Sequence, residues 1–154
     1  MGYVREIRQL IGHRTLMIVG ASVIVEDAQG RILLQRRTDN HCWGYPGGCT
    51  EPDELLEDAA RRELWEETGL TAGELQLIGA YSGPALHYTY PNGDDASIVE
   101  HLYLCRDWTG RLKPQEEEVE DLRFFSPEEL PENISPPNRP CLEDYLQKRK
   151  DGSL

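Results

Sequence analysis

The sequence predicts a domain of the α/β class, and three observations lead to this prediction. First, β-forming runs with alternating apolar side chains recur along the chain, as in residues 16–25 and 97–105. Second, residues 55–67 contain no Gly, Pro or β-branched residue, and their composition favours a helix. Third, residues 142–146 carry apolar side chains at helical spacing, which predicts another helix near the end of the chain.

The length and the charge of the chain limit what it can be. A chain of 154 residues suits one compact domain, so we expect residues 1–154 to form a single domain, with an N-terminal segment at 1–14 and a core at 15–149. The formal net charge of −12 argues against binding to a nucleic acid polymer, because phosphate backbones are held by Lys and Arg. No apolar run approaches the roughly 20 residues of a membrane span, so no membrane partner is expected.

The cysteines and the first residues indicate a cytoplasmic location. Cys42, Cys49, Cys105 and Cys141 form no C-x-x-C pair, and the N-terminus lacks a signal-peptide core. The cysteines are therefore interpreted as reduced packing residues. This interpretation is preferred over a zinc site made of His41, Cys42 and Cys49.

The first half of the chain is expected to form strands around turns. Residues 4–12 have an apolar spacing that fits either a short helix or an edge strand. Residues 16–25 and 31–37 are strongly β-forming and flank a turn at residues 27–30, so we expect them to pair as a hairpin. A glycine-rich loop at residues 41–50 then leads into the first predicted helix.

The second half adds strands, a charged loop and the final helix. Further strands are expected at residues 74–81, 86–90, 97–105 and 121–125. Residues 110–120 form an acidic loop before the last of these strands. Ser126, Pro127 and Glu129 fit the N-cap, N1 and N3 positions of a capping box, which predicts a short helix there. The final helix is expected to face the core with Leu142, Tyr145 and Leu146.

The acidic side chains of the first predicted helix lie on an unusual face. Glu63, Glu66 and Glu67 are spaced i, i+3, i+4 and project onto the face of the apolar stripe. That stripe consists of Leu55, Leu56, Ala59, Ala60 and Leu64. Crowded and partly desolvated carboxylates need a compensating cation. A hard divalent metal with oxygen ligands is the natural partner.

These residues resemble the Nudix box of the MutT-like hydrolases. The pattern runs Gly48, five residues, Glu54, seven residues, Arg62-Glu63-Leu64, one residue, Glu66-Glu67, one residue, Gly69-Leu70. It agrees with the box at every defined position. One flanking departure is Asp53, where relatives usually carry Gly, and it removes no charged residue of the box. The resemblance implies a Nudix-type α/β/α sandwich around a mixed β-sheet.

The resemblance also implies a metal-dependent hydrolase that cleaves a pyrophosphate linkage in a nucleoside diphosphate derivative, with Mg²⁺ or Mn²⁺ as the cofactor. The expected metal ligands are Glu63, Glu66, Glu67 and the carbonyl of Gly48. Arg62 is expected to pair with Glu54, because a guanidinium stays charged at neutral pH and cannot act as a base. The proton acceptor is expected to be Glu118 on the acidic loop, with Glu117 and Glu63 as alternatives.

Four residues are expected to contact the substrate: Arg36, Trp43, Gly47 and Tyr88. Trp43 and Gly47 resemble the entry loop of the family. Alternation puts Arg36 and Arg37 on opposite faces of their strand, and the resemblance to Nudix enzymes favours Arg36 as the one that points inward.

The tyrosine at position 88 either stacks on a base or packs across strands. It resembles a marker of dinucleoside polyphosphate hydrolases, whereas Pro84 lies near the spacing of a marker for ADP-ribose hydrolases. The substrate therefore stays open between a nucleoside triphosphate, ADP-ribose or another sugar nucleotide, and a dinucleoside polyphosphate.

Two other functions are alternatives to hydrolysis. The first is a catalytically idle Nudix module that binds a nucleotide and acts through a protein partner, and the second is a structural interaction protein. A homodimer is possible in each case. Trp65 falls opposite the acidic face, and a large indole is seldom left in water, so we expect the N-terminal segment or a second subunit to cover it.

Overall fold

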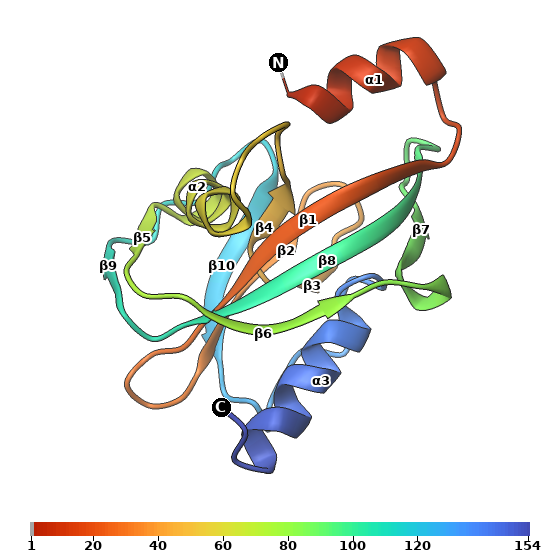
Figure 1. Cartoon of the computed structure of the whole chain (residues 1–154). Helices are drawn as coiled ribbons and strands as arrows, with labels where there is room; N and C mark the ends of the chain where they lie inside the picture. The colour runs from red at the N-terminus through yellow and green to blue at the C-terminus, as the bar shows by residue number, and fades with distance from the viewer. Residues whose placement is uncertain (1) are drawn as a thin grey trace.

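The computed structural model describes residues 2–154 as layers of helix and sheet (Figure 1). The elements in chain order are α1 (Tyr3–Ile11), β1 (Leu16–Val25), β2 (Ile32–Arg37), β3 (Trp43–Gly44), β4 (Gly47–Cys49), α2 (Leu56–Thr68), β5 (Leu70–Ala72), β6 (Gln76–Tyr81), the 3₁₀ helix η1 (Pro84–Leu86), β7 (His87–Thr89), β8 (Asp95–Cys105), β9 (Trp108–Gly110), β10 (Val119–Phe125) and α3 (Arg139–Lys150). The expected strands are all present, with ends shifted by a few residues.

A mixed five-stranded sheet forms the centre of the molecule. Strands β1 and β8 pair in parallel over ten residues, from Leu16 with Ala96 to Val25 with Cys105. Strand β4 pairs antiparallel with β1, and β6 and β7 pair antiparallel with β8. A second sheet has the order β10-β2-β3, and β5 pairs with β9.

The expected hairpin between residues 16–25 and 31–37 is wrong. Strands β1 and β2 share only an isolated bridge between Glu26 and Ile32 and then diverge into separate sheets. The reason is competition for partners: β8 and β4 occupy the edges of β1, while β10 and β3 occupy those of β2.

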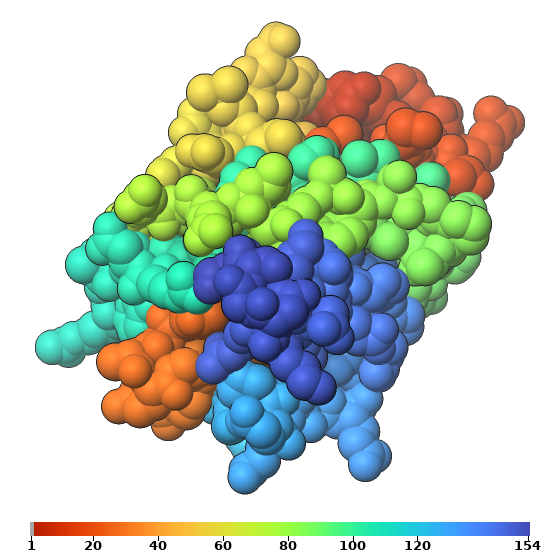
Figure 2. Space-filling model, turned by 60° about the horizontal axis from the view of Figure 1, so that its bottom comes forward, coloured from red at the N-terminus to blue at the C-terminus, as the bar shows by residue number. Residues whose placement is uncertain are grey.

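The two helices that cover the sheets lie on opposite faces and bury separate apolar cores. On one face, α2 contributes Ala59, Ala60 and Leu64. On the other, α3 contributes Cys141, Leu142 and Tyr145, with Leu146 partly buried against them. Figure 2 shows α3, in dark blue, lying across the middle of its face. This arrangement confirms the α/β/α sandwich.

Helix α2 begins and ends where backbone conformation changes. Leu55 precedes the helix in an extended conformation and is 70% exposed, so its assignment to the apolar stripe is wrong. Gly69 ends the helix with φ +78° and donates its N–H to the carbonyl of Trp65, as the αL cap predicts. Residues 110–112 pack closely there, because a Cβ at Gly69 would lie 2.8 Å from the carbonyl oxygen of Arg111.

The N-terminal residues form helix α1, which settles the choice between a helix and an edge strand. This helix buries none of its residues and runs back alongside the first part of β1 (Figure 1). It does not cover Trp65, whose side chain is 62% exposed, so that part of the expectation is wrong. None of the helices in residues 2–154 is long and apolar enough to span a membrane.

The short helix expected after β10 is also absent. Residues 126–129 form a turn, in which the N–H of Glu129 donates to the carbonyl of Ser126 at 2.9 Å. The Ser126 hydroxyl donates to the carboxylate of Glu128 instead of capping a helix. Pro131 and the prolines that follow leave no room for further helical hydrogen bonds.

We predict that Gly69→Ala destabilises the protein more than Gly152→Ala. Both glycines have nearly the same positive φ, +78° and +79°, so both substitutions carry the positive-φ strain of roughly 1–2 kcal/mol. Only at Gly69 would the new Cβ also meet backbone atoms, whereas nothing lies within 4 Å of it at Gly152. Urea unfolding of the two variants measures the difference. Equal losses in the free energy of unfolding would contradict the close packing at the end of α2.

Candidate active site

The buried carboxylate of Glu67 joins α2 to both large sheets. The side chain is 4% exposed, and its oxygens accept hydrogen bonds from Gln35 Nε2 in β2 and from the Gly47 N–H in β4, each at 2.8 Å. Burial raises the pKa of Glu67 to about 8, and repulsion from Glu63 adds to the shift. The end of α2 is thus held by a carboxylate whose charged form a nearby cation would stabilise.

The guanidinium of Arg62 lies among the other acids of the box. Its Nε and Nη2 donate to both carboxylate oxygens of Glu54, at 2.8 and 2.9 Å. Its Nη1 donates to Glu63 at 2.9 Å and to Glu66 at 3.4 Å. The expected Arg62–Glu54 pair is therefore present, and the guanidinium holds the pKa of Glu54 below its usual value.

The two glycines of β4 make room for different neighbours, because Gly48 lets α2 approach the strand and Gly47 lets Ser22 of β1 do so. A Cβ at Gly47 would lie 1.9 Å from Ser22 Oγ, and a Cβ at Gly48 would lie 2.5 Å from the carboxylate carbon of Glu63. Asp53, at the turn before Glu54, has φ +64°, which lies in the region that glycine adopts most easily. The positive φ of this turn explains why relatives usually carry glycine at position 53, and Asp53 adopts the same backbone conformation.

The residues expected to hold a metal lie together at the junction of α2 and β4. Among residues 2–154, however, no three His, Cys, Asp or Glu side chains converge into a preformed metal cage. The carboxylates take separate partners because like charges repel: Glu67 turns to the sheet, while Glu63 and Glu66 turn to Arg62. The donor set consists only of carboxylate and carbonyl oxygens, and this chemistry fits a hard divalent cation.

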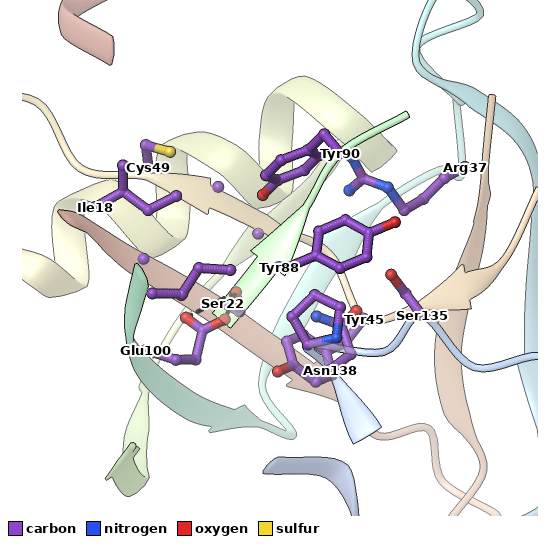
Figure 3. Close-up of a pocket in the computed structure, with 15 residues that line it drawn as sticks. Ile18, Ser22, Arg37, Tyr45, Cys49, Tyr88, Tyr90, Glu100, Ser135 and Asn138 are labelled. Atoms are coloured by element: carbon purple, nitrogen blue, oxygen red, sulfur yellow. Dashed lines mark hydrogen bonds between the residues drawn. The ribbon is translucent and has the colours of Figure 1, made fainter. Parts of the chain in front are cut away.

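A pocket with a cavity volume of about 80 Å³ opens beside Gly47 and Gly48. The rings of Tyr88 and Tyr90 meet edge to face on its wall, with centroids 4.8 Å apart, and the Tyr88 hydroxyl accepts a hydrogen bond from Asn40 at 3.0 Å. Figure 3 shows the lining side chains, with Ser22 beside Glu100 and with Arg37 farther along. The structure therefore places Tyr88 and Gly47, two expected substrate contacts, in one pocket.

The floor of this pocket holds polar groups that the sequence did not reveal. Glu100 is 6% exposed, and the Ser22 hydroxyl lies 3.2 Å from both of its carboxylate oxygens. Burial raises the pKa of Glu100 to about 7. The hydroxyl of Tyr45 is also buried here, and no group in residues 2–154 forms a hydrogen bond with it. One feature of the sequence could have indicated that Glu100 is buried: alternation along β8 puts it on the same face as Ile98 and Leu102.

The expectation that Arg36 points toward α2 is wrong. Its side chain is 44% exposed and pairs with Glu120 at 3.2 Å. Arg37 lines the pocket instead and pairs with Asp39 at 2.7 Å. The reason lies in the alternation of β2, because Arg37 shares the face of Gln35, whose amide contacts Glu67.

Trp43 is a second residue that the structure places away from the pocket. The indole is 7% exposed and belongs to the core beneath α3. It packs edge to face on Phe125, with ring centroids 5.0 Å apart, while Arg123 lies 5.7 Å from the ring centroid. Trp43 thus supports β2 and β10 from the face opposite to α2.

Glu118 lies at the end of the acidic loop, near the buried end of α2. It lines a hollow together with Gln35, Arg37 and Glu67. The carbonyl of Glu118 accepts a hydrogen bond from the Thr38 N–H at 3.0 Å. The Gln35 Oε1 atom is buried there, and no donor in the described part of the chain reaches it. The loop therefore brings the expected proton acceptor to the same region as the carboxylates of α2.

The fold and the site together define a class of protein. An α/β/α sandwich presents the carboxylates of one helix beside a glycine-rich strand and an aromatic-walled pocket. The model of the NUDIX domain matches residues 17–145. The chain belongs to the Nudix family.

Relatives and solved structures agree with this membership. A provisionally named 8-oxo-dGTP diphosphatase of Bacillus subtilis (strain 168) is 33% identical over 132 residues, which cover 86% of this chain and 82% of that protein. An ADP-ribose pyrophosphatase of Methanocaldococcus jannaschii is 32% identical, covering 79% of this chain and 69% of its own length. The crystal structure of a MutT NUDIX hydrolase from Burkholderia pseudomallei superimposes with a TM-score of 0.72 at 28% identity, covering 84% of this chain and 98% of that chain. The protein is therefore an enzyme of the Nudix pyrophosphohydrolases, a family that generally depends on divalent metal.

We predict that the carboxyl of Glu100 makes stability depend on pH. The ordinary pKa is 4.5 and the folded pKa is about 7, so the folded protein keeps this proton while the unfolded chain loses it. The free energy of unfolding should therefore fall as pH rises from 4.5 to 7. Relative to Glu100→Gln, which cannot ionise, the wild type should lose up to about 3 kcal/mol over this window. Urea unfolding at several pH values with a chelator measures it, and a difference that stays constant with pH would contradict the prediction.

Proposed function

We propose that this enzyme hydrolyses a pyrophosphate linkage in a nucleoside diphosphate derivative, using Mg²⁺ or Mn²⁺. The observation that carries the proposal is the meeting of two features at β4. The carboxylates of Glu63 and Glu67 lie against Gly48 and Gly47, and the same two glycines line the tyrosine-walled pocket. A substrate with an aromatic base and a pyrophosphate would span the two.

The metal would be held by oxygen atoms of α2 and β4. We assign this role to Glu63, Glu66, Glu67 and the carbonyl of Gly48. When bound, a divalent cation neutralises phosphate oxygens and lowers the pKa of water. The raised pKa of Glu67 supports the assignment, because a buried carboxylate with like-charged neighbours binds a cation at little electrostatic cost.

The remaining residues would position the acids and the substrate. Arg62 orients Glu63 and Glu66 through its hydrogen bonds and is itself fixed by Glu54. Arg37 is the cation of β2 that lines the pocket, so we assign to it the substrate contact first expected of Arg36. Tyr88 would stack on the base, and the backbone of Gly47 would let the pyrophosphate approach β4.

A glutamate of the acidic loop would accept the proton of the attacking water. We assign this role to Glu118, because the carboxylates of α2 lose basicity when they bind a cation. Its position beside Glu67 and Gln35 supports the assignment. Glu117 and Glu63 are the alternatives.

The alternative of an idle binding module is disfavoured by the intact box. Such a module would be expected to lack some of the charged residues, whereas Glu54, Arg62, Glu63, Glu66 and Glu67 are all present. Relatives are named for 8-oxo-dGTP and for ADP-ribose. Nucleoside triphosphates, ADP-ribose or sugar nucleotides, and dinucleoside polyphosphates are therefore the substrates to screen, in a cytoplasmic enzyme that acts on small nucleotides.

We predict that Glu66→Gln and Glu67→Gln each lower kcat by more than about 100-fold, because removing even a group that only supports a metal ligand costs 10–100-fold. The fold should survive, since neither change empties the core. Glu57→Gln is the matched control, because Glu57 lies on the solvent face of α2 and, among residues 2–154, forms an ion pair only with Arg61. Turnover at saturating Mg²⁺ and far-UV circular dichroism measure both effects. Wild-type turnover in the two variants would contradict the metal assignment.

We predict that Glu118→Gln lowers kcat by about 10²–10⁴-fold and removes the acidic limb of the pH–rate profile, as loss of a general base does. Glu116→Gln, in the same loop, is the control and should keep both. The profiles are recorded at saturating metal beside Glu63→Gln. If Glu118→Gln keeps its rate and its acidic limb while Glu63→Gln loses them, the base lies on the helix.

A further inference from the structure

The floor of the tyrosine pocket carries a carboxyl group that has no cation beside it. Glu100 lines the pocket and is 6% exposed, and within residues 2–154 no Lys, Arg or His side chain forms an ion pair with it. Arg37, the cation that lines the same pocket, pairs with Asp39 instead. A buried carboxyl without a cation is costly, so its presence at the floor of a pocket needs a physical explanation.

The protein uses only part of the hydrogen-bonding capacity of this carboxyl. The Ser22 hydroxyl lies 3.2 Å from both oxygens, and the N–H of His101 donates to Oε1 of Glu100 at 3.1 Å. A carboxylate has about four acceptor sites, so lone pairs remain for a donor from outside the chain. An acceptor oxygen persists in either protonation state, because a neutral carboxylic acid keeps its carbonyl oxygen.

A hydroxyl group near this carboxyl also lacks a partner. The Tyr45 side chain lines the same pocket (Figure 3), and no group in residues 2–154 satisfies its buried hydroxyl. Burial, and after it the charge of Glu100, raises the pKa of Tyr45, so the hydroxyl keeps its proton and remains a donor. Buried polar groups in proteins are nearly always paired. The floor therefore offers an acceptor and a donor to a ligand.

Close packing against strand backbone fixes these polar groups. A Cβ at Gly20 would lie 2.8 Å from Oε1 of Glu100, and a Cβ at Gly47 would lie 1.9 Å from Ser22 Oγ. The aromatic wall of Tyr88 and Tyr90 belongs to the same pocket. An apolar wall combined with a few placed polar groups is typical of a site that orients a flat ligand.

The polar floor complements one kind of nucleobase edge. Adenine and cytosine carry an exocyclic amine, which donates, next to an unprotonated ring nitrogen, which accepts. The amine protrudes beyond the ring and would reach the carboxyl, while the ring nitrogen would accept from the tyrosine hydroxyl. Hypoxanthine and uracil carry a carbonyl and a ring N–H at these positions. Their carbonyl oxygen would face the lone pairs of the carboxyl.

We propose that Glu100, together with Ser22 and Tyr45, selects the base of the nucleotide, so that the enzyme prefers adenine or cytosine to hypoxanthine or uracil. Glu100 accepts from the exocyclic amine, and Tyr45 donates to the neighbouring ring nitrogen. Ser22 keeps the carboxyl in place. This inference rests on the proposed function and adds the identity of the base to it.

The test measures binding of nucleoside monophosphates, which contain no pyrophosphate linkage and so report on the pocket without turnover. The wild type is titrated with AMP, IMP, CMP and UMP and followed by NMR chemical shifts. The titrations are made at pH 8, above the folded pKa of about 7 for Glu100, where the ionised carboxylate cannot donate to a carbonyl. In at least one of the pairs AMP/IMP and CMP/UMP, the amine-bearing nucleotide should bind about tenfold more tightly, as expected for a hydrogen bond to a charged group.

Three variants assign this preference to the floor. Glu100→Gln should bring the ratio of the dissociation constants close to one, because a side-chain amide can turn its NH₂ group toward a carbonyl. Tyr45→Phe should weaken binding of the preferred nucleotide several-fold. Glu143→Gln is the matched control, because Glu143 is an exposed carboxylate of α3 that does not line the pocket, and it should keep the wild-type ratio. A purely structural role of Glu100 would weaken both members of a pair equally.

The same titrations separate failure of this inference from failure of the proposed function. Base selection would be overturned by equal affinities within both pairs, by preference for IMP or UMP, by no saturable binding of any of the four, or by a ratio that Glu100→Gln leaves unchanged. A wild type that shows the preference in binding but cleaves no nucleoside triphosphate, ADP-ribose or dinucleoside polyphosphate would overturn the proposed function and leave base selection standing.

Discussion

The hydrogen bonds of the Glu67 carboxylate are the constraint on which the site depends. One oxygen accepts from Gly47 in the five-stranded sheet and the other accepts from Gln35 in the three-stranded sheet. A single buried side chain therefore fixes α2 against both sheets. The helix can approach so closely only because Gly48 has no Cβ. The position of every other acid on α2 follows from this attachment.

Charge balance explains why these acids coexist in a stable protein. A buried carboxylate is costly unless it is paired or protonated. Arg62 supplies one solution through its contacts with Glu54, Glu63 and Glu66, and Glu67 adopts the other, because its pKa rises to about 8. Without a cation, this cluster of carboxylates raises the electrostatic free energy of the folded protein. A bound divalent cation would lower it.

The sequence was sufficient where local chemistry decides the structure. The composition of residues 55–67 predicted helix α2, and Gly69 predicted its end. The spacing of the acids predicted their common face, and the Arg62–Glu54 pair was also expected. It was insufficient where distant segments compete: β1 and β2 look like a hairpin, but β8 and β10 are their stronger partners. The choice between Arg36 and Arg37 depended on which face of β2 meets α2, and periodicity alone does not give that. Glu100 was missed because a carboxylate in a strand is usually assigned to solvent.

The parallel pairing of β1 with β8 also determines when the domain can fold. Leu16 pairs with Ala96 and Val25 pairs with Cys105, so every partner lies 80 positions away along the chain. Contacts of such long range require closure of a large loop before they contribute any stability, and chains rich in them fold slowly. During synthesis, the central strand therefore waits without its main partner until β8 has been made. Its apolar run is most vulnerable to aggregation during that interval.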